Sequence, residues 1–412
     1  MGKAYDAIIV GARCAGAPTA MLLARQGYRV LVVDRARFPS DTVSTHVVQP
    51  RGTAALGRWG LLERLVATGC PAVHTYTFDF GPFTIAGAPG TAEAPVAYCP
   101  RRTVLDKLLV DAAAEAGAEI REEFTVDEVL SEDGRLIGIK GHGRDGDAVV
   151  ERASVIIGAD GRHSLVAQAV HPEQYNEKPP LMACYYTYWS GLPMHGRFET
   201  YIRPNRGFAA IETHDGLTMV VAGWPFAEFE ANKKDIEVSY MQVLALAPAF
   251  AERIRGAKRE ARFAGAALPN FFRKPYGPGW ALVGDAGFNK DPITAQGISD
   301  AFRDAELCAA ALDQSWRGAR PFDAAMAEYQ ATRDRNSVAM YEFTCELARM
   351  QPPPAEVKQV LAALPGDQAA MDGFAQLNAG TISPPEFFAP QNIGAILTSA
   401  AQRTGGVQMR AS

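Results

Sequence analysis

The stretch Y-D-A-I-I-V-G-A-R-C-A-G, residues 5–16, decides the fold of this chain. Its apolar run up to Val10 is typical of a buried strand, and the Ala- and Leu-rich run from Pro18 to Gln26 is typical of a helix. A second apolar run then ends on Asp34. Strand, helix and strand in this order predict a β-α-β unit and therefore a parallel sheet.

The same stretch carries the pattern of a dinucleotide site. Gly11 permits the tight turn, Gly16 lets helix and strand approach closely, and the helix N-terminus faces a pyrophosphate. Asp34 follows at a distance where its carboxylate can hydrogen-bond a ribose. Arg13 replaces the second glycine of the pattern, and its guanidinium could pair with phosphate oxygens. Cys14 lies beside the helix N-terminus, which lowers a thiol pKa, although its small size in a tight turn explains it better.

A second G-x-G-x-x-G pattern occurs at Gly141, Gly143 and Gly146. It lies between two expected strands and no helix follows it, so we interpret it as a hairpin loop. The sequence therefore predicts one nucleotide site.

Composition excludes several classes of protein. The 412 residues predict two to three domains, with 48% hydrophobic and 21% charged residues. Because 41 Lys and Arg stand against 46 Asp and Glu (41 − 46 = −5), we expect no nucleic-acid or anionic-membrane partner. No apolar run approaches the roughly 20 residues of a membrane helix. The run from Ala7 to Val10 is too short for a signal peptide, which favours a cytoplasmic location.

The cysteines and histidines point to no metal. Six cysteines lie far apart without a C-x-x-C pair, and seven histidines show no H-x-x-x-H spacing. We expect reduced thiols and no metal site.

Two further motifs follow the dinucleotide turn along the chain. The first is I-I-G-A-D-G-R-H-S, residues 156–164, at the end of an apolar strand. The second is Gly284-Asp285, followed by D-P-I-T-A-Q-G at 291–297 and a helix expected from Gly297 to Leu312. Each alone is common in α/β folds, but their joint occurrence behind the dinucleotide turn is specific.

Together, these motifs resemble those of the FAD-dependent monooxygenases of the aromatic hydroxylase type, and of their relatives the geranylgeranyl reductases and flavin halogenases. Arg102 also resembles the arginine-led helix start of the family. The resemblance covers roughly half of the chain (5–52, 100–170 and 275–325). It implies bound FAD, with NAD(P)H as the reductant.

The resemblance also implies roles for single residues. Asp285 would hydrogen-bond the ribityl chain, Pro292 would lie near the reactive carbon of the flavin, and the helix start would face its N1/O2 edge. Asp160 would serve the pyrophosphate and NAD(P)H. Two positions depart from the family: Ala167 stands where many members have Arg, and Ala295 where many have Gly. The implied cofactor-binding residues are Gly11, Arg13, Cys14, Ala15, Gly16, Asp34, Arg35, Arg37, Thr45, Arg102, Asp160, Gly284, Asp285, Pro292, Gln296, Gly297 and Ile298.

The loop after the second strand, residues 41–52, passes near the flavin in such enzymes. Thr45, His46 and Gln49 are its polar members. His46 could act as an acid or base, since a free histidine titrates near neutrality. It could equally hold the loop by bonding backbone groups. His46 and Pro292 are therefore the two candidate catalytic residues.

Alternating strands predict a second, antiparallel sheet between Cys184 and Trp224. Only alternate members of an aromatic strand can share one face. Tyr186 and Tyr188 are one such pair, and His74 and Tyr76 on an earlier strand are another. These four residues are the candidate substrate-pocket residues.

The expected architecture is α/β, with a Rossmann-like FAD-binding domain interleaved with an antiparallel-sheet substrate domain. We assign 1–72, 101–178 and 275–340 to the FAD-binding domain and 73–100 and 179–274 to the substrate domain. Residues 341–412 form a C-terminal helical region.

The resemblance implies a monooxygenase that uses NAD(P)H and O2 to form a flavin C4a-hydroperoxide. It would hydroxylate or epoxidise an electron-rich aromatic or polycyclic small molecule. The sequence does not decide between a monomer and a homodimer. A geranylgeranyl-reductase-like enzyme is the alternative, because residues 291–302 also resemble that branch, although its Tyr/Trp-rich tract is not evident at 207–212. The W-x-W-x-I-P tract of halogenases is missing. A non-catalytic escort protein on the same fold is a third reading, favoured by Arg13 and opposed by Asp34, Asp160 and Asp285.

Overall fold

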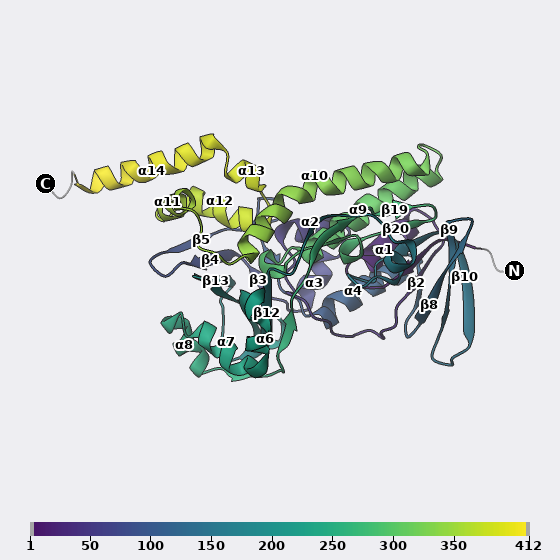
Figure 1. Cartoon of the computed structure of the whole chain (residues 1–412), viewed down its shortest axis with the longest axis horizontal. Coiled ribbons are helices and arrows are strands. Elements are labelled where there is room, and N and C mark those ends of the chain that lie inside the picture. Colours follow the sequence, from purple (N-terminus) through teal and green to yellow (C-terminus); the bar gives the residue numbers. More distant parts are fainter. Residues whose placement is uncertain (1–3, 409–412) are drawn as a thin grey trace.

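The computed structural model describes residues 4–408, in which two large sheets are interleaved along the chain (Figure 1). The first sheet is parallel around β1, where Ala7 pairs with Val30 on one side and Val155 on the other. The expected β-α-β unit and parallel sheet are confirmed. The strands, in spatial order, are β20 (Trp280–Leu282), β10 (Ala148–Gly158), β1 (Tyr5–Val10), β2 (Val30–Val33) and β7 (Glu119–Arg121), with the short β19 (Tyr276–Gly277) at the edge beside β20.

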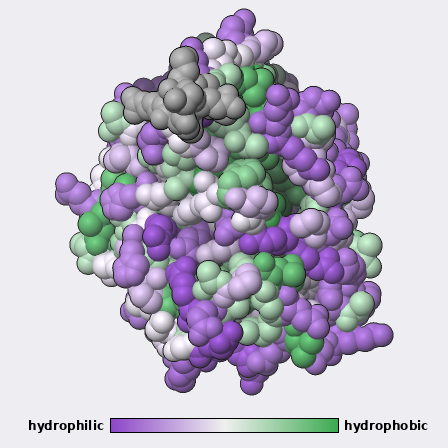
Figure 2. Space-filling model, turned by 90° about the vertical axis from the view of Figure 1, so that its left-hand side faces the viewer, coloured by the Kyte–Doolittle hydropathy of each residue, from purple (hydrophilic) through white to green (hydrophobic). Residues whose placement is uncertain are grey.

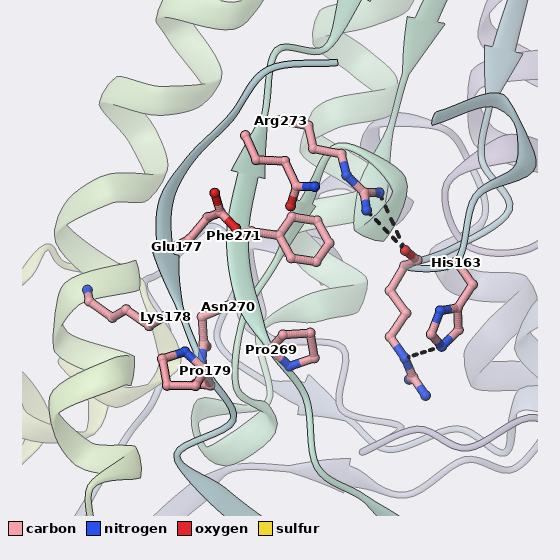
Figure 3. Close-up of a pocket in the computed structure, with 10 residues that line it drawn as sticks. His163, Glu177, Lys178, Pro179, Pro269, Asn270, Phe271 and Arg273 are labelled. Atoms are coloured by element: carbon pink, nitrogen blue, oxygen red, sulfur yellow. Dashed lines mark hydrogen bonds between the residues drawn. The ribbon is translucent and has the colours of Figure 1, made fainter. Parts of the chain in front are cut away.

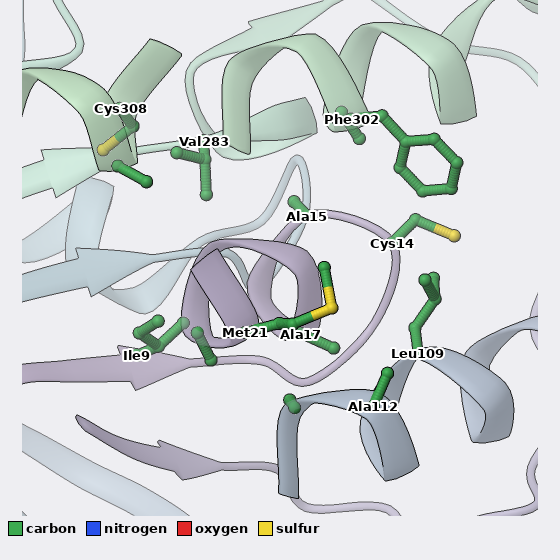
Figure 4. Close-up of a cluster of buried hydrophobic side chains, with 14 of the residues drawn as sticks. Ile9, Cys14, Ala15, Ala17, Met21, Leu109, Ala112, Val283, Phe302 and Cys308 are labelled. Carbon is green, nitrogen blue, oxygen red and sulfur yellow. The ribbon is translucent and has the colours of Figure 1, made fainter. Parts of the chain in front are cut away.

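Three helices and the sheet enclose the first core. α1 (Gly16–Arg25) packs between α4 (Arg102–Glu115) and α9 (Gly297–Trp316), as Figure 4 shows around Met21, Leu109 and Phe302. These residues are at most 1% exposed. Burial of this size is what holds the dinucleotide turn against the sheet. Neighbouring helices are α2 (Pro50–Arg58), α3 (Leu62–Ala67) and α5 (Leu165–Val170).

The second glycine-rich pattern forms a hairpin loop, as predicted. β9 (Arg135–His142) pairs antiparallel with β10, with His142 opposite Ala148. The three glycines therefore lie at or near the turn that joins two strands. β8 (Thr125–Glu132) extends this hairpin on its other side.

The second sheet is antiparallel except at one pairing. Its strand β13 (Arg197–Arg203) runs parallel to β4 (Thr75–Asp79), which comes from a much earlier part of the chain. The expectation of a purely antiparallel sheet therefore misses this one junction. The remaining order is β16 (Lys258–Arg259), β12 (Met182–Ser190), β15 (Leu217–Pro225), β14 (Arg206–Glu212), β13, β4 and β5 (Thr84–Gly87), with β17 (Ala264–Ala266) also on β12.

The two faces of β12 belong to different cores. Tyr186 and Tyr188 pack with Tyr76 and Phe78 on one face, which we call the aromatic face. Tyr185 and its neighbours lie on the other face, under the helices α6 (Phe229–Asn232), α7 (Ile236–Leu244) and α8 (Pro248–Arg255). The predicted alternation is thus confirmed.

The C-terminal helices cover the edge of the aromatic face. α12 (Gln368–Ala379) packs on β4 and β5, and the rings of Phe374 and Phe78 lie 4.9 Å apart. Figure 1 shows these helices beyond the end of the long α10, and Figure 2, which views this end, shows apolar side chains scattered among hydrophilic ones. The helices are α10 (Phe322–Ala348), α11 (Ala355–Ala363), α12, α13 (Pro384–Phe387) and α14 (Pro390–Gln408).

A small sheet joins the two halves, with β18 (Asn270–Arg273) between β11 (Gln174–Lys178) and β21 (Phe288–Asn289). A two-stranded ladder, β3 (Ala72–Val73) and β6 (Ala97–Tyr98), precedes α4. The assigned domain boundary at 340/341 lies inside α10, and the division into domains stays a proposal.

Candidate functional site

The dinucleotide turn is shaped by backbone contact at its two glycines. Gly11 has φ +101°, and a Cβ there would lie 2.5 Å from the carbonyl oxygen of Ala159. A Cβ at Gly16 would lie 1.8 Å from the carbonyl oxygen of Gly11. Only glycine fits these two positions, because any side chain would push the turn off the sheet and off α1.

Asp34 lies where the ribose carboxylate was predicted. Its two oxygens accept hydrogen bonds from the backbone N–H groups of Ala12 and Ala36, both at 2.8 Å. Asp34 thereby ties the end of β2 to the dinucleotide turn. Arg35 and Arg37 beside it are exposed, and within residues 4–408 no ion pair engages them.

Arg13 does not point its donors at an open phosphate position. Its guanidinium lies 2.5 Å from Asp106, donates to the hydroxyl of Ser40 at 2.7 Å and contacts the carbonyl oxygen of Asp41 at 3.3 Å. Arg102 binds the same carboxylate at 2.9 Å. Asp106, which the sequence reasoning did not single out, is therefore the centre of a buried charged cluster beneath the turn.

Cys14 donates to this cluster, with its Sγ 3.3 Å from Asp106. Burial raises the pKa of the Cys14 thiol, and the nearby Arg102 only partly opposes it. A helix N-terminus does not activate this thiol, and small size in a tight turn is the better account of it.

The turn at Gly284 and Asp285 packs directly against the dinucleotide turn. A Cβ at Gly284, which has φ +58°, would lie 2.8 Å from the Cβ of Ala15. Asp285 on this turn is exposed to solvent, yet desolvation by the surrounding protein raises its pKa to about 6. The carboxylate is therefore accessible to a ligand while protein atoms crowd around it.

Asp160 lies on the neighbouring loop. One carboxylate oxygen accepts from the N–H of Leu165 at 2.6 Å, and the other is buried with no partner among the described residues. Desolvation raises its pKa. A buried oxygen without a donor is costly unless a ligand supplies one.

The loop over residues 290–297 leads into α9. Ala295 holds φ +51°, a conformation that glycine adopts at less cost, as the family pattern would require. A Cβ at Gly297 would meet nothing within 4 Å, so the helix start faces open space. Pro292 is partly exposed beside it, whereas Ile298 is buried.

Gln296 is already engaged by the protein. Its amide oxygen accepts from Arg51 at 2.7 Å and its amide nitrogen donates to the carbonyl of Asn378 at 2.9 Å. The side chain is 1% exposed, so only its backbone could face a cofactor. The contact ties the loop to the C-terminal helices, which the sequence did not predict.

His46 is fully buried with φ +61°. Its Nε2 lies 2.5 Å from the hydroxyl of Tyr188, while its Nδ1 has no partner among residues 4–408. Burial, aided by the charge of Arg102, lowers its pKa to about 3. His46 is therefore neutral at physiological pH, which favours a positioning role over proton exchange with solvent.

Gln49 connects the aromatic face to the 290–297 loop. Its amide oxygen accepts from the hydroxyl of Tyr76 at 2.6 Å, and its amide nitrogen donates to the carbonyl of Thr294 at 3.1 Å. Tyr186 approaches the loop at 41–52, where its hydroxyl accepts from the N–H of Ser44 at 3.4 Å. The predicted pocket residues Tyr76, Tyr186 and Tyr188 thus come together.

Two predicted residues lie apart from this group. His74 is exposed and packs beside the turn at Gly196. Thr45 is partly exposed, and its carbonyl oxygen accepts a long contact of 3.9 Å from the thiol of Cys99. Neither side chain contacts His46 through a hydrogen bond that the described chain contains.

A buried ion cluster beneath the start of α9 was missed by the sequence reasoning. Asp300 pairs with Arg51 at 2.7 Å, with Arg303 at 2.9 Å and with Lys290. Asp304 pairs with Arg303 at 2.7 Å. The acidic spacing on α9 was visible, but its basic partners come from three separate segments.

A cleft of about 420 Å³ opens beside the loop at residues 159–164, which we call the D-G loop (Figure 3). Arg273 donates to the carbonyl of Arg162 at 3.4 Å, and His163 and Lys178 also line the cleft. Glu177 is the acidic side chain among its lining residues. The cleft therefore presents a mainly basic surface next to Asp160.

These features fit FAD. Gly11 and Gly16 form a cradle against Ala159, beside Asp160 and its buried oxygen without a partner among the described residues. Gly284, beside the desolvated Asp285, lies against Ala15 of the same turn. Within residues 4–408, no three His, Cys, Asp or Glu side chains gather to hold a metal ion. All six cysteines belong to this part of the chain, and none of them forms a disulfide bond there.

The fold and site define an FAD-binding protein. Residues 4–344 match the family described as FAD binding domain, and the chain belongs to that family. In the part of the chain that the structure describes, no helix is both long and apolar enough to cross a bilayer.

Curated relatives include protein FixC of Salmonella typhi, 33% identical over 172 residues that cover 40% of this chain and 38% of FixC. The match thus spans under half the length of that relative. Digeranylgeranylglycerophospholipid reductase of Methanocella arvoryzae is 26% identical over 80% of this chain and 84% of the reductase.

Solved structures share the fold. The myxobacterial chondrochloren halogenase CndH superposes with a TM-score of 0.78 at 22% identity, over 97% of both chains. PqsL of P. aeruginosa, in complex with 2-aminobenzoylacetate, superposes with a TM-score of 0.74 at 24% identity, over 84% of this chain and 96% of PqsL.

Proposed function

We propose that this chain is a monooxygenase that uses NAD(P)H and O2 to hydroxylate or epoxidise an electron-rich aromatic or polycyclic small molecule. The observation that carries the proposal is the junction at Gln49, which joins the aromatic face to the 290–297 loop. A planar substrate beside this junction would lie between the helix start at Gly297 and the tyrosines of β12. PqsL, crystallised with an aminobenzoyl compound, supports the same class of substrate.

Bound FAD would supply electron transfer and the activation of O2. Gly11, Gly16, Asp34 and Asp285 would hold it. The N-terminus of α9, at Gly297, would stabilise negative charge that develops on the reduced ring.

The substrate side binds, orients and excludes water. His46 stays neutral and fixes the hydroxyl of Tyr188 by a short hydrogen bond. The C-terminal helices close the same side, since Gln296 is bound to the carbonyl of Asn378. Exclusion of water protects a reactive oxygen donor from wasteful breakdown.

The basic cleft supports NAD(P)H as the reductant. Arg162, Lys178 and Arg273 line it beside Asp160, and phosphate groups favour such surroundings. The cleft opens on the D-G loop and not on the aromatic face, so reductant and substrate would approach from different sides.

The experiment is oxidation of NAD(P)H by the FAD-loaded protein, with O2 uptake recorded in parallel. A panel of aromatic and polyketide compounds is screened for stimulation of both signals. The proposal predicts matched stimulation of NAD(P)H oxidation and O2 uptake by at least one aromatic compound, with no stimulation in Asp285→Ala. Stimulated NAD(P)H oxidation without O2 uptake would contradict it.

A second candidate is saturation of an isoprenoid double bond. It is favoured by the alignment to digeranylgeranylglycerophospholipid reductase, which spans 84% of that enzyme. Anaerobic incubation of reduced protein with a geranylgeranyl lipid separates the two candidates, because alkene reduction needs no O2. Loss of double bonds under these conditions would favour the reductase.

A further inference from the structure

Residues 38–46 form a segment, which we call the strap, between the end of β2 and α2. Within residues 4–408 its backbone makes no hydrogen bond to the backbone of another segment. Side chains hold it instead. Since such a segment has little intrinsic order, the few side chains that anchor it decide how often it opens.

One anchor is Arg13 of the dinucleotide turn. Its guanidinium is held 2.5 Å from the fully buried Asp106, and from there it donates to the hydroxyl of Ser40 at 2.7 Å. Two weaker contacts of 3.3 Å reach the carbonyl oxygens of Ser40 and Asp41. All these contacts lie in one forked group, which a lysine could not reproduce.

At the same end the backbone N–H of Phe38 donates to Glu122 at 3.1 Å, and the remaining anchors lie on the substrate side. Arg101 pairs with Asp41 at 3.1 Å and stacks over the ring of Tyr188 at 4.2 Å. His46 at the far end binds the same tyrosine. The strap is thus clasped by Arg13 at the cofactor end and by Arg101 at the substrate end.

The strap runs from the dinucleotide turn, where Arg13 binds Ser40, to the aromatic face, where His46 binds Tyr188. It begins four residues after Asp34, which lies at the predicted ribose position, and ends three residues before Gln49, which bonds to the carbonyl of Thr294 on the flavin loop. A dinucleotide bound at the turn, with its ring toward the aromatic face, would follow the same direction as the strap.

We infer that Arg13 is a clasp that keeps the strap closed over bound FAD, so that it governs how fast FAD enters and leaves and not how tightly FAD binds at equilibrium. It is a positioning residue, because its donors engage Asp106 and the strap. The inference rests on FAD binding and is independent of the proposed oxygenation.

The test is the kinetics of FAD exchange in apo-protein, followed by flavin fluorescence, for wild type, Arg13→Gln and Arg13→Gly. Loss of charge-assisted bonds to the strap should raise both the association and the dissociation rate constants about tenfold, with the dissociation constant changed less than about threefold. Trypsin should also cut faster after the exposed Arg35 and Arg37.

Matched controls sharpen the result. Arg64→Gln removes a similar ion pair, 2.7 Å from Glu115 on the surface, and should change neither rate. Arg13→Lys should behave like Arg13→Gln, because one ammonium cannot span Asp106 and Ser40 together. A dissociation constant that is raised tenfold, with an unchanged association rate constant, would overturn the clasp and make Arg13 a phosphate ligand. Unchanged rates and unchanged cleavage in all three Arg13 variants would also overturn it.

Discussion

Around Gly11 and Gly16 the chain touches its own backbone, whereas around His46 and Tyr188 side chains from distant segments meet. In the first region the structure depends on the absence of a Cβ, with 1.8 Å between a Cβ at Gly16 and the carbonyl oxygen of Gly11. In the second it depends on hydroxyl, imidazole and amide groups that bond across three segments. Backbone contact leaves a local signature in sequence, and side-chain convergence does not.

The largest effect is expected in the first region, where adding a single methyl group should strongly destabilise the fold. Gly16→Ala should lower the free energy of unfolding by about 3 kcal/mol or more, because the new methyl group collides with backbone. Urea unfolding of the apo-protein measures this directly. A variant as stable as wild type would show that the turn is not packed as described.

Gly297→Ala is the matched control for that variant. A Cβ there meets no protein atom within 4 Å, so the fold should keep its stability within about 1 kcal/mol. FAD binding should nevertheless weaken, since the open space at the start of α9 is where the cofactor ring is proposed to lie. Unimpaired FAD binding in Gly297→Ala would move the ring away from α9.

Asp285→Ala tests the cofactor region without touching its backbone. Removal of a charge-assisted hydrogen bond to FAD should weaken binding by about tenfold to a hundredfold. Equilibrium titration of the apo-protein with FAD gives the ratio. Full FAD loading of the variant at wild-type affinity would mean that Asp285 does not contact the cofactor.

The second region should reveal itself through pH. His46 has a pKa of about 3 in the folded chain and 6.5 when free, so between these values the unfolded chain binds the proton and the folded chain does not. Stability therefore falls as pH falls, by about 2 kcal/mol between about pH 7.5 and about pH 5.

His46→Asn should remove this part of the acid dependence, and asparagine tolerates the positive φ at this position. Tyr188→Phe is the control, because it breaks the same hydrogen bond but leaves the buried histidine. Urea unfolding at the two pH values should show a smaller change in the free energy of unfolding with pH for His46→Asn alone. Equal slopes in all three proteins would contradict a buried neutral histidine.

The smallest effect is expected at Ala295. Glycine relieves the cost of φ +51° but loses a buried methyl group, so Ala295→Gly should stay within about 1 kcal/mol of wild type. Ala301→Gly, at a helical alanine that is equally 5% exposed, should cost about 2 kcal/mol. Chemical denaturation of the pair measures the difference. Equal losses would show that Ala295 is unstrained.

The predictable part of the molecule was the part with local signatures. A short stretch of sequence is enough to recognise the turn at Gly11, the strand that ends on Asp34 and the motif at Asp285. The parallel sheet follows from them. The pairing of Tyr186 with Tyr188 also followed from strand alternation.

The rest depends on segments that the sequence does not bring together. Asp106 lies 93 positions from the Arg13 that it binds, and Asn378 lies 82 positions from Gln296. His46 was predicted to lie near the cofactor, but its burial, which decides its charge, depends on Tyr186 and Tyr188 of β12. Arg13 was read as a phosphate partner because nothing local reveals that Asp106 and Ser40 take its donors.

Titration of the purified apo-protein with FAD tests the central claim most directly. One FAD should bind per chain and saturate, with its fluorescence changed by the surrounding protein. Gly297→Ala should fold normally and bind more weakly in the same titration. A folded wild-type protein that binds no FAD would contradict the account, and would leave an escort protein on this fold as the better reading.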